Sequence, residues 1–283
     1  MARAVLLGNS GFVGRAVERC LLRASLKVHG FSSTTLDLNQ PAALHRLDSL
    51  LDGDATLIVL SGLTPEKGAD VETLARHLGM LLNLGQHLQE RTIGHCVYVS
   101  SDAVYPLRFS PITEETGVEP ANLYALAKYA GERILSHACQ VSGSSLLVLR
   151  LTATYGPGDT HHSYGPNRFM QMALAERRIQ IFGNGEEQRD HIYIEDVAAL
   201  ILRLLERGAT GTFNLATGAS HSFREVAELV RDIVPDAEIA SVLRQGEITH
   251  RHFDVTRLFL AVPDFIFTPL DLGLRAYYQA CSK

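Results

Sequence analysis

The chain has 283 residues, of which 46% are hydrophobic and 20% are charged, and its formal net charge is −5. These values are typical of a globular protein with a substantial core, and they exclude an intrinsically disordered chain. Lys and Arg are spread along the sequence instead of clustering, so we expect neither a nucleic-acid partner nor a membrane surface as partner.

Short apolar runs alternate with helical patterns through the first half of the sequence. Strands are expected at 3–8, 26–32, 55–62, 95–101 and 144–152, and helices at 12–24, 41–51, 70–90 and from Asn122 onward. The strand runs are continuously apolar, which is typical of a parallel sheet covered by helices on both faces. The predicted fold class is therefore α/β, with a doubly wound parallel Rossmann sheet.

The sequence changes character after Tyr155. A Gly- and Pro-rich segment, "GPGDTHHSYGPN", follows, and the later elements are shorter and less regular. A helix at 193–208 and a strand at 211–218 are expected to return to the large sheet. We therefore expect a Rossmann domain at 1–155 with return segments at about 191–218, and a smaller C-terminal lobe formed mainly by 156–283.

The cysteines and the apolar runs bear on the cellular compartment of the protein. Its four cysteines, Cys20, Cys96, Cys139 and Cys281, share no metal-ligand spacing and are interpreted as reduced thiols. The apolar run before Gly8 is too short for a signal peptide, and the run "SLLVLRL" is broken by Arg150. We therefore expect a cytoplasmic protein without a membrane segment.

Three glycines stand between the first strand and the first helix, in the motif "GNSGFVG". Gly8 permits a tight turn, Gly11 allows a pyrophosphate to approach the backbone, and Gly14 allows the helix to pack closely on the strand. The spacing G-x-x-G-x-x-G differs from the usual G-x-G-x-x-G. The motif predicts a dinucleotide site, NAD(P), that includes Phe12 and Val13 at the start of the helix.

The end of the second strand bears on the choice between NAD and NADP. An NAD enzyme usually has Asp or Glu there for the ribose diol, whereas this chain has Ser32 and Ser33. No carboxylate would repel a 2′-phosphate, although no arginine follows to bind it either. The pattern therefore favours NADP slightly.

The stretch "YALAK" places Tyr124 and Lys128 four residues apart, one turn apart on the same face of a helix that Asn122 can cap. Taken alone, the pair is equally consistent with a phenol beside an ammonium group on a solvated surface.

Several motifs, in order, carry a family resemblance. They are "GNSGFVG", "LDL" with Asp37, "VSSDAVYP", "YALAK", "LRLTATYGPGD" and "IFGNGEEQRDHIYIEDVA". Together they resemble the extended short-chain dehydrogenase/reductases, that is, the NAD(P)-dependent epimerase/dehydratase family, which acts mainly on nucleotide sugars. The resemblance covers nearly the whole chain.

The resemblance implies a role for each matching residue. Tyr124 would be the general acid/base, and Lys128 would bind the nicotinamide ribose and help to lower the pKa of the phenol. Lowering that pKa by about three units requires roughly 4 kcal/mol of preferential stabilisation. Ser101 would hold the substrate oxygen, with Ser100 as the alternative. Among the remaining matches, Asp37 would lie near the adenine, and Asp102 and Arg189 would contact the substrate, with Arg189 on a diphosphate.

The chain also departs from the family pattern. Ala103 stands where sugar dehydratases carry a Glu, so dehydration is not expected. Two family Asn positions fall at Ala153 and Arg76. The chain is short for a nucleotide-sugar epimerase, which indicates a trimmed substrate lobe.

The sequence therefore predicts a nucleotide-sugar epimerase, with an NADPH-dependent 4-keto-sugar reductase as the alternative within enzymes. A non-catalytic Rossmann dinucleotide sensor is a further alternative, which Ser101, Tyr124 and Lys128 argue against. We expect a homodimer by family analogy. No metal site is expected, because the adjacent His161 and His162 are interpreted as part of a substrate-side loop.

Overall fold

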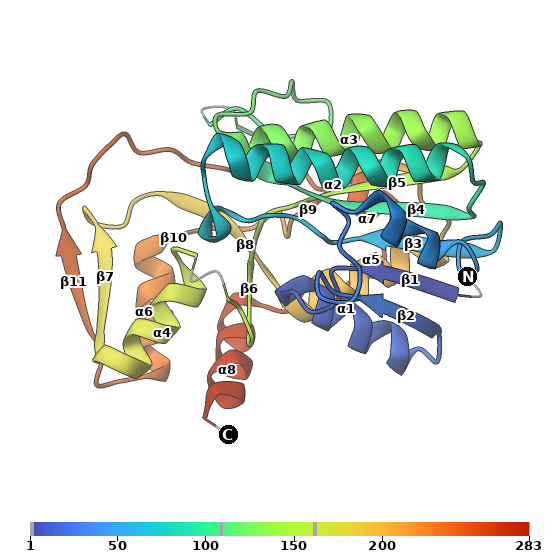
Figure 1. Ribbon diagram of the computed structural model, residues 1–283. Coiled ribbons are helices and arrows are strands. Elements are labelled where there is room, and N and C mark those ends of the chain that lie inside the picture. Colours follow the sequence, from blue (N-terminus) through green and yellow to red (C-terminus); the bar gives the residue numbers. More distant parts are fainter. Residues whose placement is uncertain (1–2, 108–109, 161–162, 283) are drawn as a thin grey trace.

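The computed structural model describes residues 3–107, 110–160 and 163–282. Its main body is a six-stranded parallel sheet in the order β2-β1-β3-β4-β5-β9 (Figure 1). The strands are β1 (Arg3–Leu7), β2 (Lys27–Phe31), β3 (Ala55–Val59), β4 (His95–Ser101), β5 (Ser145–Leu151) and β9 (Gly211–Leu215). The chain runs from β1 outward to β2 and then returns to β3 on the other side of β1, so the strand order reverses at β1. A sheet of this kind binds ligands in the crevice beyond the carboxyl ends of the strands at that point.

Helices cover both faces of this sheet, which confirms the predicted doubly wound α/β fold. The helices α2 (Val71–Gln89) and α3 (Leu123–Ser142) lie side by side on one face, and α1 (Phe12–Arg23) and α5 (Ile194–Glu206) cover the other (Figure 1). Each face has its own hydrophobic core, which joins the apolar stripes of its helices to alternate side chains of the strands. This two-sided burial is why the strands are continuously apolar in sequence.

The segment expected as a helix at 41–51 is instead a 3-10 helix at Pro41–Leu47. Leu44 and Leu47 are both fully buried against the sheet. A 3-10 helix has three residues per turn, so it places residues three apart on the same side. The packing of these two leucines therefore suits the tighter helix.

The smaller lobe stands beyond the carboxyl ends of the strands. It contains α4 (Pro166–Glu176), α6 (Phe223–Ile233) and α8 (Leu270–Cys281), with the two-stranded sheet of β7 (Arg178–Phe182) and β11 (Glu238–Val242). A three-stranded sheet of β10 (Ser220–Ser222), β8 (Gln188–Tyr193) and β6 (Ala153–Tyr155) lies between the lobe and the main body (Figure 1).

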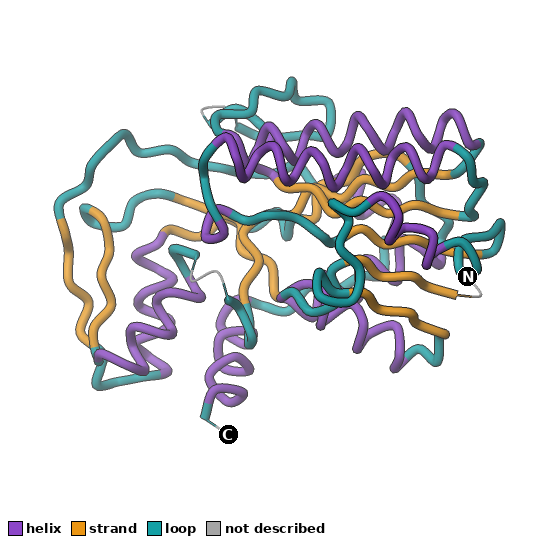
Figure 2. The backbone as a smooth tube through the Cα atoms, in the orientation of Figure 1, coloured by secondary structure: helices purple, strands orange, loops and turns teal. Residues whose placement is uncertain are grey.

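The residues after β11 contribute both to the main body and to the smaller lobe. After β11, residues 243–255 return as an extended loop to α7 (Thr256–Ala261), which packs on the core of the large sheet (Figure 2). The chain then re-enters the smaller lobe as α8. Within the described residues, no helix is both long and apolar enough to cross a bilayer.

Candidate active site

A cleft of about 730 Å³ lies between the carboxyl ends of the strands and the smaller lobe. Ten residues predicted from the sequence line it: Gly8, Gly11, Phe12, Val13, Gly14, Ser101, Asp102, Tyr124, Lys128 and Arg189. Three others, Ser32, Ser33 and Asp37, are not among its lining residues. The fold thus brings together side chains that are far apart in the sequence.

The glycine loop has backbone geometry that other residues would disturb. Gly8 has φ of +95°, and a Cβ added there would lie 2.8 Å from the backbone nitrogen of Ser61. At Gly14 an added Cβ would lie 2.1 Å from the carbonyl oxygen of Gly8. Gly11 caps α1 and has no side chain to accept from the first N–H groups of the helix, which are therefore available to an anion. These residues fit the pyrophosphate of a dinucleotide.

The end of β2 lies outside the cleft lining and is rich in hydroxyl groups. Ser32 Oγ lies 2.7 Å from Thr34 Oγ1, and the carboxylate of Asp37 accepts a hydrogen bond from the backbone N–H of Asn39 (3.0 Å). The structure adds an arginine that the sequence did not lead us to expect here. Arg46, from the 3-10 helix, donates to the carbonyl oxygen of Thr35 and lies 5.9 Å from the ring centre of Phe31.

Helix α3 presents Tyr124 and Lys128 to the cleft. Asn122 caps the helix as predicted, because its side chain accepts from the N–H of Ala125 at 2.9 Å. Lys128 is buried, and its Nζ donates to the carbonyl oxygen of Val99 (2.9 Å) while lying 6.0 Å from the centre of the Tyr124 ring. The pair is therefore part of the cleft wall and not a solvated surface pair.

Burial shifts the pKa of both groups toward their neutral forms. It raises the pKa of Tyr124 to about 12, against a hydrogen bond from Ser101 that lowers it. Burial also lowers the pKa of Lys128 to about 8, against the charge of Glu132, which raises it. Tyr124 is therefore protonated at neutral pH.

The two serines at the end of β4 have different partners. Ser101 hydrogen-bonds to Tyr124, and its Oγ also accepts from the N–H of Ala103 (3.2 Å). Ser100 instead donates to Glu132 Oε1 at 2.5 Å, within the buried layer between sheet and α3. Both serines line the cleft, but the hydroxyl of Ser101 is bonded to Tyr124, whereas that of Ser100 is bonded to Glu132.

Asp102 has a partner that sequence patterns did not reveal. Arg251, which is only 5% exposed, forms an ion pair with it: Nε lies 3.2 Å from Oδ2, and Nη2 donates to the Asp102 carbonyl oxygen at 2.6 Å. Burial raises the pKa of Asp102, while the charges of Arg251 and Arg189 oppose that shift. Arg251 belongs to the irregular segment 243–255, which carries no motif.

Arg189 reaches the cleft from β8. Its Nη2 donates to Thr249 Oγ1 (2.9 Å) and to Glu187 Oε1 (3.3 Å), and its guanidinium lies 5.9 Å from the centre of the Phe223 ring. Glu187 also pairs with Arg244 at 2.7 Å, so it would keep a cationic partner without Arg189. Its Nη1 also donates to the carbonyl oxygens of Gln188 (2.9 Å) and Thr249, so both terminal nitrogens of the guanidinium are bonded within the protein.

Two buried histidines near these residues were missed by sequence reasoning. On α2, His77 and not Arg76 turns toward the site: a Cβ added at Gly62 would lie 3.2 Å from Lys128 Nζ and 3.4 Å from His77 Nε2. On β8, His191 lines the cleft and pairs in register with Ala153 of β6. Burial lowers the pKa of each histidine to about 3, so both are neutral at physiological pH.

No group of three or more His, Cys, Asp or Glu side chains within the described residues gathers closely enough to hold a metal ion. The histidine pair at 161 and 162 lies outside the described residues.

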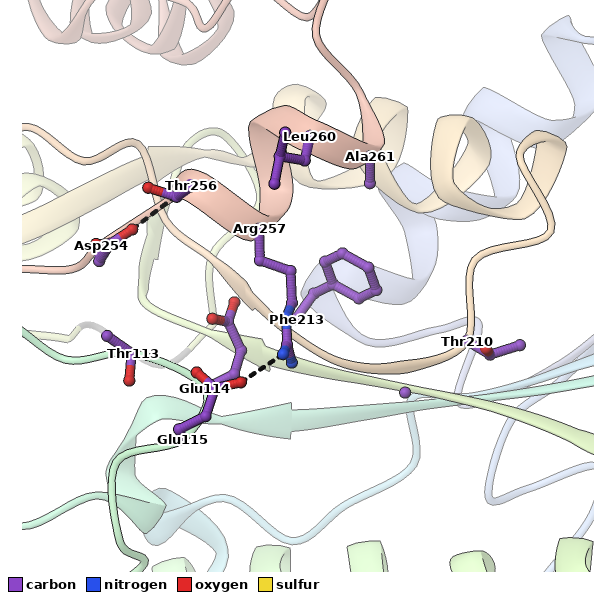
Figure 3. A pocket seen from close by; sticks show the side chains of 11 residues that line it. Thr113, Glu114, Glu115, Thr210, Phe213, Asp254, Thr256, Arg257, Leu260 and Ala261 are labelled. Carbon is purple, nitrogen blue, oxygen red and sulfur yellow. Dashed lines mark hydrogen bonds and ion pairs between the residues drawn. The ribbon is translucent and has the colours of Figure 1, made fainter.

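A second hollow, of about 780 Å³, lies at the outer edge of the sheet, where β9 has no neighbouring strand (Figure 3). Its charged side chains bind the protein itself. Glu114 accepts from the N–H of Asn214 (2.8 Å), and Arg257 donates to the carbonyl oxygen of Thr212 (3.1 Å) and pairs with Glu115. We therefore assign this hollow a structural role, because its side chains form hydrogen bonds with backbone groups of the edge strand β9.

The fold and the cleft place a glycine loop typical of dinucleotide-binding proteins beside a helix that carries a tyrosine and a lysine. Residues 4–216 match the model of the NAD dependent epimerase/dehydratase family. The chain belongs to this family, which confirms the predicted family, the enzyme class and NAD(P) as the cofactor class.

Named relatives include both reductases and epimerases. The chain is 31% identical over 257 residues to GDP-6-deoxy-D-mannose reductase of Pseudomonas aeruginosa, covering 82% of this chain and 80% of the relative. It is 27% identical over 193 residues to the uncharacterized UDP-glucose epimerase YtcB of Bacillus subtilis, covering 66% of this chain and 61% of the relative.

Solved structures show the same fold over nearly the whole chain. RMD from Pseudomonas aeruginosa, complexed with NADPH, superposes with a TM-score of 0.87 at 29% identity, covering 99% of this chain and 98% of that one. The Thermus thermophilus UDP-glucose 4-epimerase complexed with NAD superposes with a TM-score of 0.85 at 21% identity, over 98% of each chain.

Proposed function

We propose that this protein is an NADPH-dependent reductase that acts on a keto sugar linked to a nucleoside diphosphate. The observation that carries the proposal is the cleft itself, which Ser101, Tyr124 and Lys128 line together with the glycine loop and Arg189. The sequence led us to expect an epimerase first and a reductase second. We place the reductase first because the reductase relative is the more similar of the two and is matched over more of both chains.

The epimerase remains a second candidate, supported by the similarity to YtcB. Reduction of a carbonyl requires a proton donor at the substrate oxygen, and Tyr124 would supply it. With a pKa raised to about 12, the phenol holds its proton at neutral pH and can donate it to the substrate oxygen that Ser101 binds.

The residues divide into a cofactor group and a substrate group. Gly8, Gly11 and Gly14, with the N-terminus of α1, would hold the pyrophosphate, and Lys128 would bind the nicotinamide ribose. The bound cofactor would supply the hydride. Asp102, directly after β4, and Arg189, on β8, would hold the substrate where the three-stranded sheet meets the main body.

The preference for NADPH over NADH is part of the proposal. Ser32 and Ser33 leave the end of β2 without a carboxylate, and Arg46 provides a cation beside the neighbouring hydroxyl groups. Hydroxyl and guanidinium groups suit a 2′-phosphate, which Asp or Glu would repel.

We further propose that the protein is a cytoplasmic homodimer. The supporting observation for the dimer is a set of exposed apolar side chains on the paired helices α2 and α3: Leu82, Leu126 and Val141 are 49%, 42% and 57% exposed. A second copy of the chain packed on these two helices would bury these side chains.

The reaction can be tested by following NADPH absorbance with GDP-linked and UDP-linked 4-keto sugars. We expect NADPH to be consumed in proportion to the keto sugar, and NADH to be used more slowly. Conversion of UDP-glucose without net consumption of NADPH would instead identify an epimerase. If neither reaction occurs with any of these nucleotide sugars, the proposed substrate class is wrong.

Replacing Arg189 with Ala should weaken nucleotide binding, because it removes a charge-assisted contact worth roughly 1.5–3 kcal/mol. We expect the affinity for GDP or UDP, measured by calorimetry, to fall about tenfold or more, while NADPH affinity is unchanged. Arg231→Ala, at an exposed site on α6, is the matched control and should leave both affinities at their wild-type values. Equal nucleotide affinity in the wild type and Arg189→Ala would remove this residue from the diphosphate site.

A further inference from the structure

A buried layer of charged side chains lies behind the face of α3 that carries Tyr124 and Lys128. Lys128 and Glu132 are each 5% exposed, and Arg150 of β5 is 6% exposed. The carboxylate of Glu132 accepts two hydrogen bonds from Arg150, from Nε at 3.0 Å and from Nη2 at 2.7 Å, and a third from Ser100 Oγ at 2.5 Å. A single carboxylate therefore links α3 to both β4 and β5.

Glu132 follows Lys128 by four residues, as Lys128 follows Tyr124, so the three side chains form one row along α3. The contacts within this row are specific. Lys128 Nζ is bonded to the Val99 carbonyl oxygen, whereas the Glu132 oxygens are occupied by Arg150 and Ser100. Glu132 therefore acts on Lys128 through its charge and not through a hydrogen bond.

Glu132 supplies the negative charge that balances the cations of this buried layer. Lys128 and Arg150 are cations, and Glu132 is the carboxylate between them. The other titratable groups near Lys128 are neutral: Tyr98 of β4, whose ring centre lies 5.5 Å from Nζ, Tyr124 on the same helix, and His77 of α2. If Glu132 lost its charge, two cations would share a buried layer that has no counter-charge.

In that case Lys128 is the group that would give up its proton. A guanidinium stays protonated in proteins, whereas a buried lysine readily becomes neutral. The pKa of Lys128 already lies near 8 because of burial, and the charge of Glu132 is what opposes that shift. The ammonium that faces the cleft thus depends on a carboxylate that does not reach the cleft.

We propose that Glu132 is a positioning residue for the reaction: held by Arg150 and Ser100, it keeps Lys128 in its charged form and fixes α3 against the strand that ends in Ser101. This inference rests on the proposed function, because it assumes that Lys128 binds the cofactor. It assigns the Arg150–Glu132 pair a task beyond stability, since a buried ion pair by itself adds little to the free energy of folding.

The test is the pH dependence of NADPH binding, followed by NADPH fluorescence between about pH 6.5 and pH 9.5. In the wild type we expect affinity to fall severalfold as the pH rises through about 8, where Lys128 loses its proton. In Glu132→Gln the midpoint of that fall should move to lower pH by about one unit. In Arg150→Gln, which removes the competing cation and keeps the carboxylate, the midpoint should move to higher pH.

Opposite shifts in the two variants distinguish a charge effect from structural damage, which would weaken binding at every pH in both. Glu132→Asp keeps the charge and should hold the midpoint near the wild-type value. Glu206→Gln, which removes an exposed carboxylate on α5 at the opposite face of the sheet, is the matched control and should not shift it. Circular dichroism establishes whether each variant is folded. If Glu132→Gln does not fold, the direction of the midpoint shift in Arg150→Gln tests the inference alone.

Wild-type midpoints in both folded variants, or shifts in the same direction, would overturn the inference while leaving the proposed function intact. A wild-type protein that binds neither NADPH nor NADH would overturn the proposed function, and the inference with it.

Discussion

Replacing Tyr124 with Phe should reduce turnover by a factor on the order of 10²–10⁴, because it removes the group that delivers a proton to the substrate oxygen. The ring remains to fill its place on α3, so the fold and NADPH affinity should be nearly unchanged. The variant also lacks the hydrogen bond between the phenol and Ser101. Ser101 would then bind the substrate oxygen without a proton donor beside it. The measurement is the rate of NADPH consumption with the keto sugar that the wild type accepts.

The matched control is Tyr129→Phe, on the same helix but outside the cleft lining. It should retain wild-type turnover. If Tyr124→Phe also turns over at the wild-type rate on the same substrate, Tyr124 is not the acid/base of this enzyme.

Replacing Gly14 with Ala should impair both folding and cofactor binding. The added methyl would lie 2.1 Å from the carbonyl oxygen of Gly8 and 2.8 Å from the Cα of Asn9. Both are backbone atoms, so relief requires α1 to move away from the loop that it helps to form. We expect a destabilisation at the upper end of roughly 1–3 kcal/mol, seen as a lower midpoint of thermal unfolding, and NADPH binding weakened about tenfold or more.

Gly117→Ala is the control for this substitution. An added Cβ at Gly117 meets no atom within 4 Å, and its φ is not in the left-handed region. Its unfolding temperature and NADPH affinity should match those of the wild type. A Gly14→Ala protein that binds NADPH as tightly as the wild type would show that the close approach of helix and loop is not required.

Much of the large sheet could be predicted because its signals are local. The strand 95–101 is predicted with the bounds that the structure gives, and α3 begins where Asn122 caps it. The third strand ends earlier than predicted, at Val59, because the apolar residues that follow it turn into the cleft wall, where Leu60 lies. Hydrophobicity by itself does not distinguish a strand from the lining of a site.

The partners of the site residues were mostly beyond the reach of sequence patterns. Arg251 reaches Asp102 from an irregular segment, and Arg46 reaches the end of β2 from a 3-10 helix. On α2, the inward position falls at His77 instead of Arg76, since a shift of one residue turns a helix by about 100°. None of these residues belongs to a motif, so only the folded chain shows which of them contact the predicted site residues.

The sequence by itself determined the fold class, the glycine loop and the Tyr124–Lys128 pair, because each depends on residues that are near one another in the chain. Strand and helix periodicities, a turn that needs glycine and a four-residue helical spacing are all local properties. The tertiary structure decided which charges share a buried layer, since that depends on how α3 packs on β4 and β5. Electrostatic interactions strengthen as water is excluded, so the pKa of Tyr124, the charge of Lys128 and the role of Glu132 follow from packing and not from sequence order.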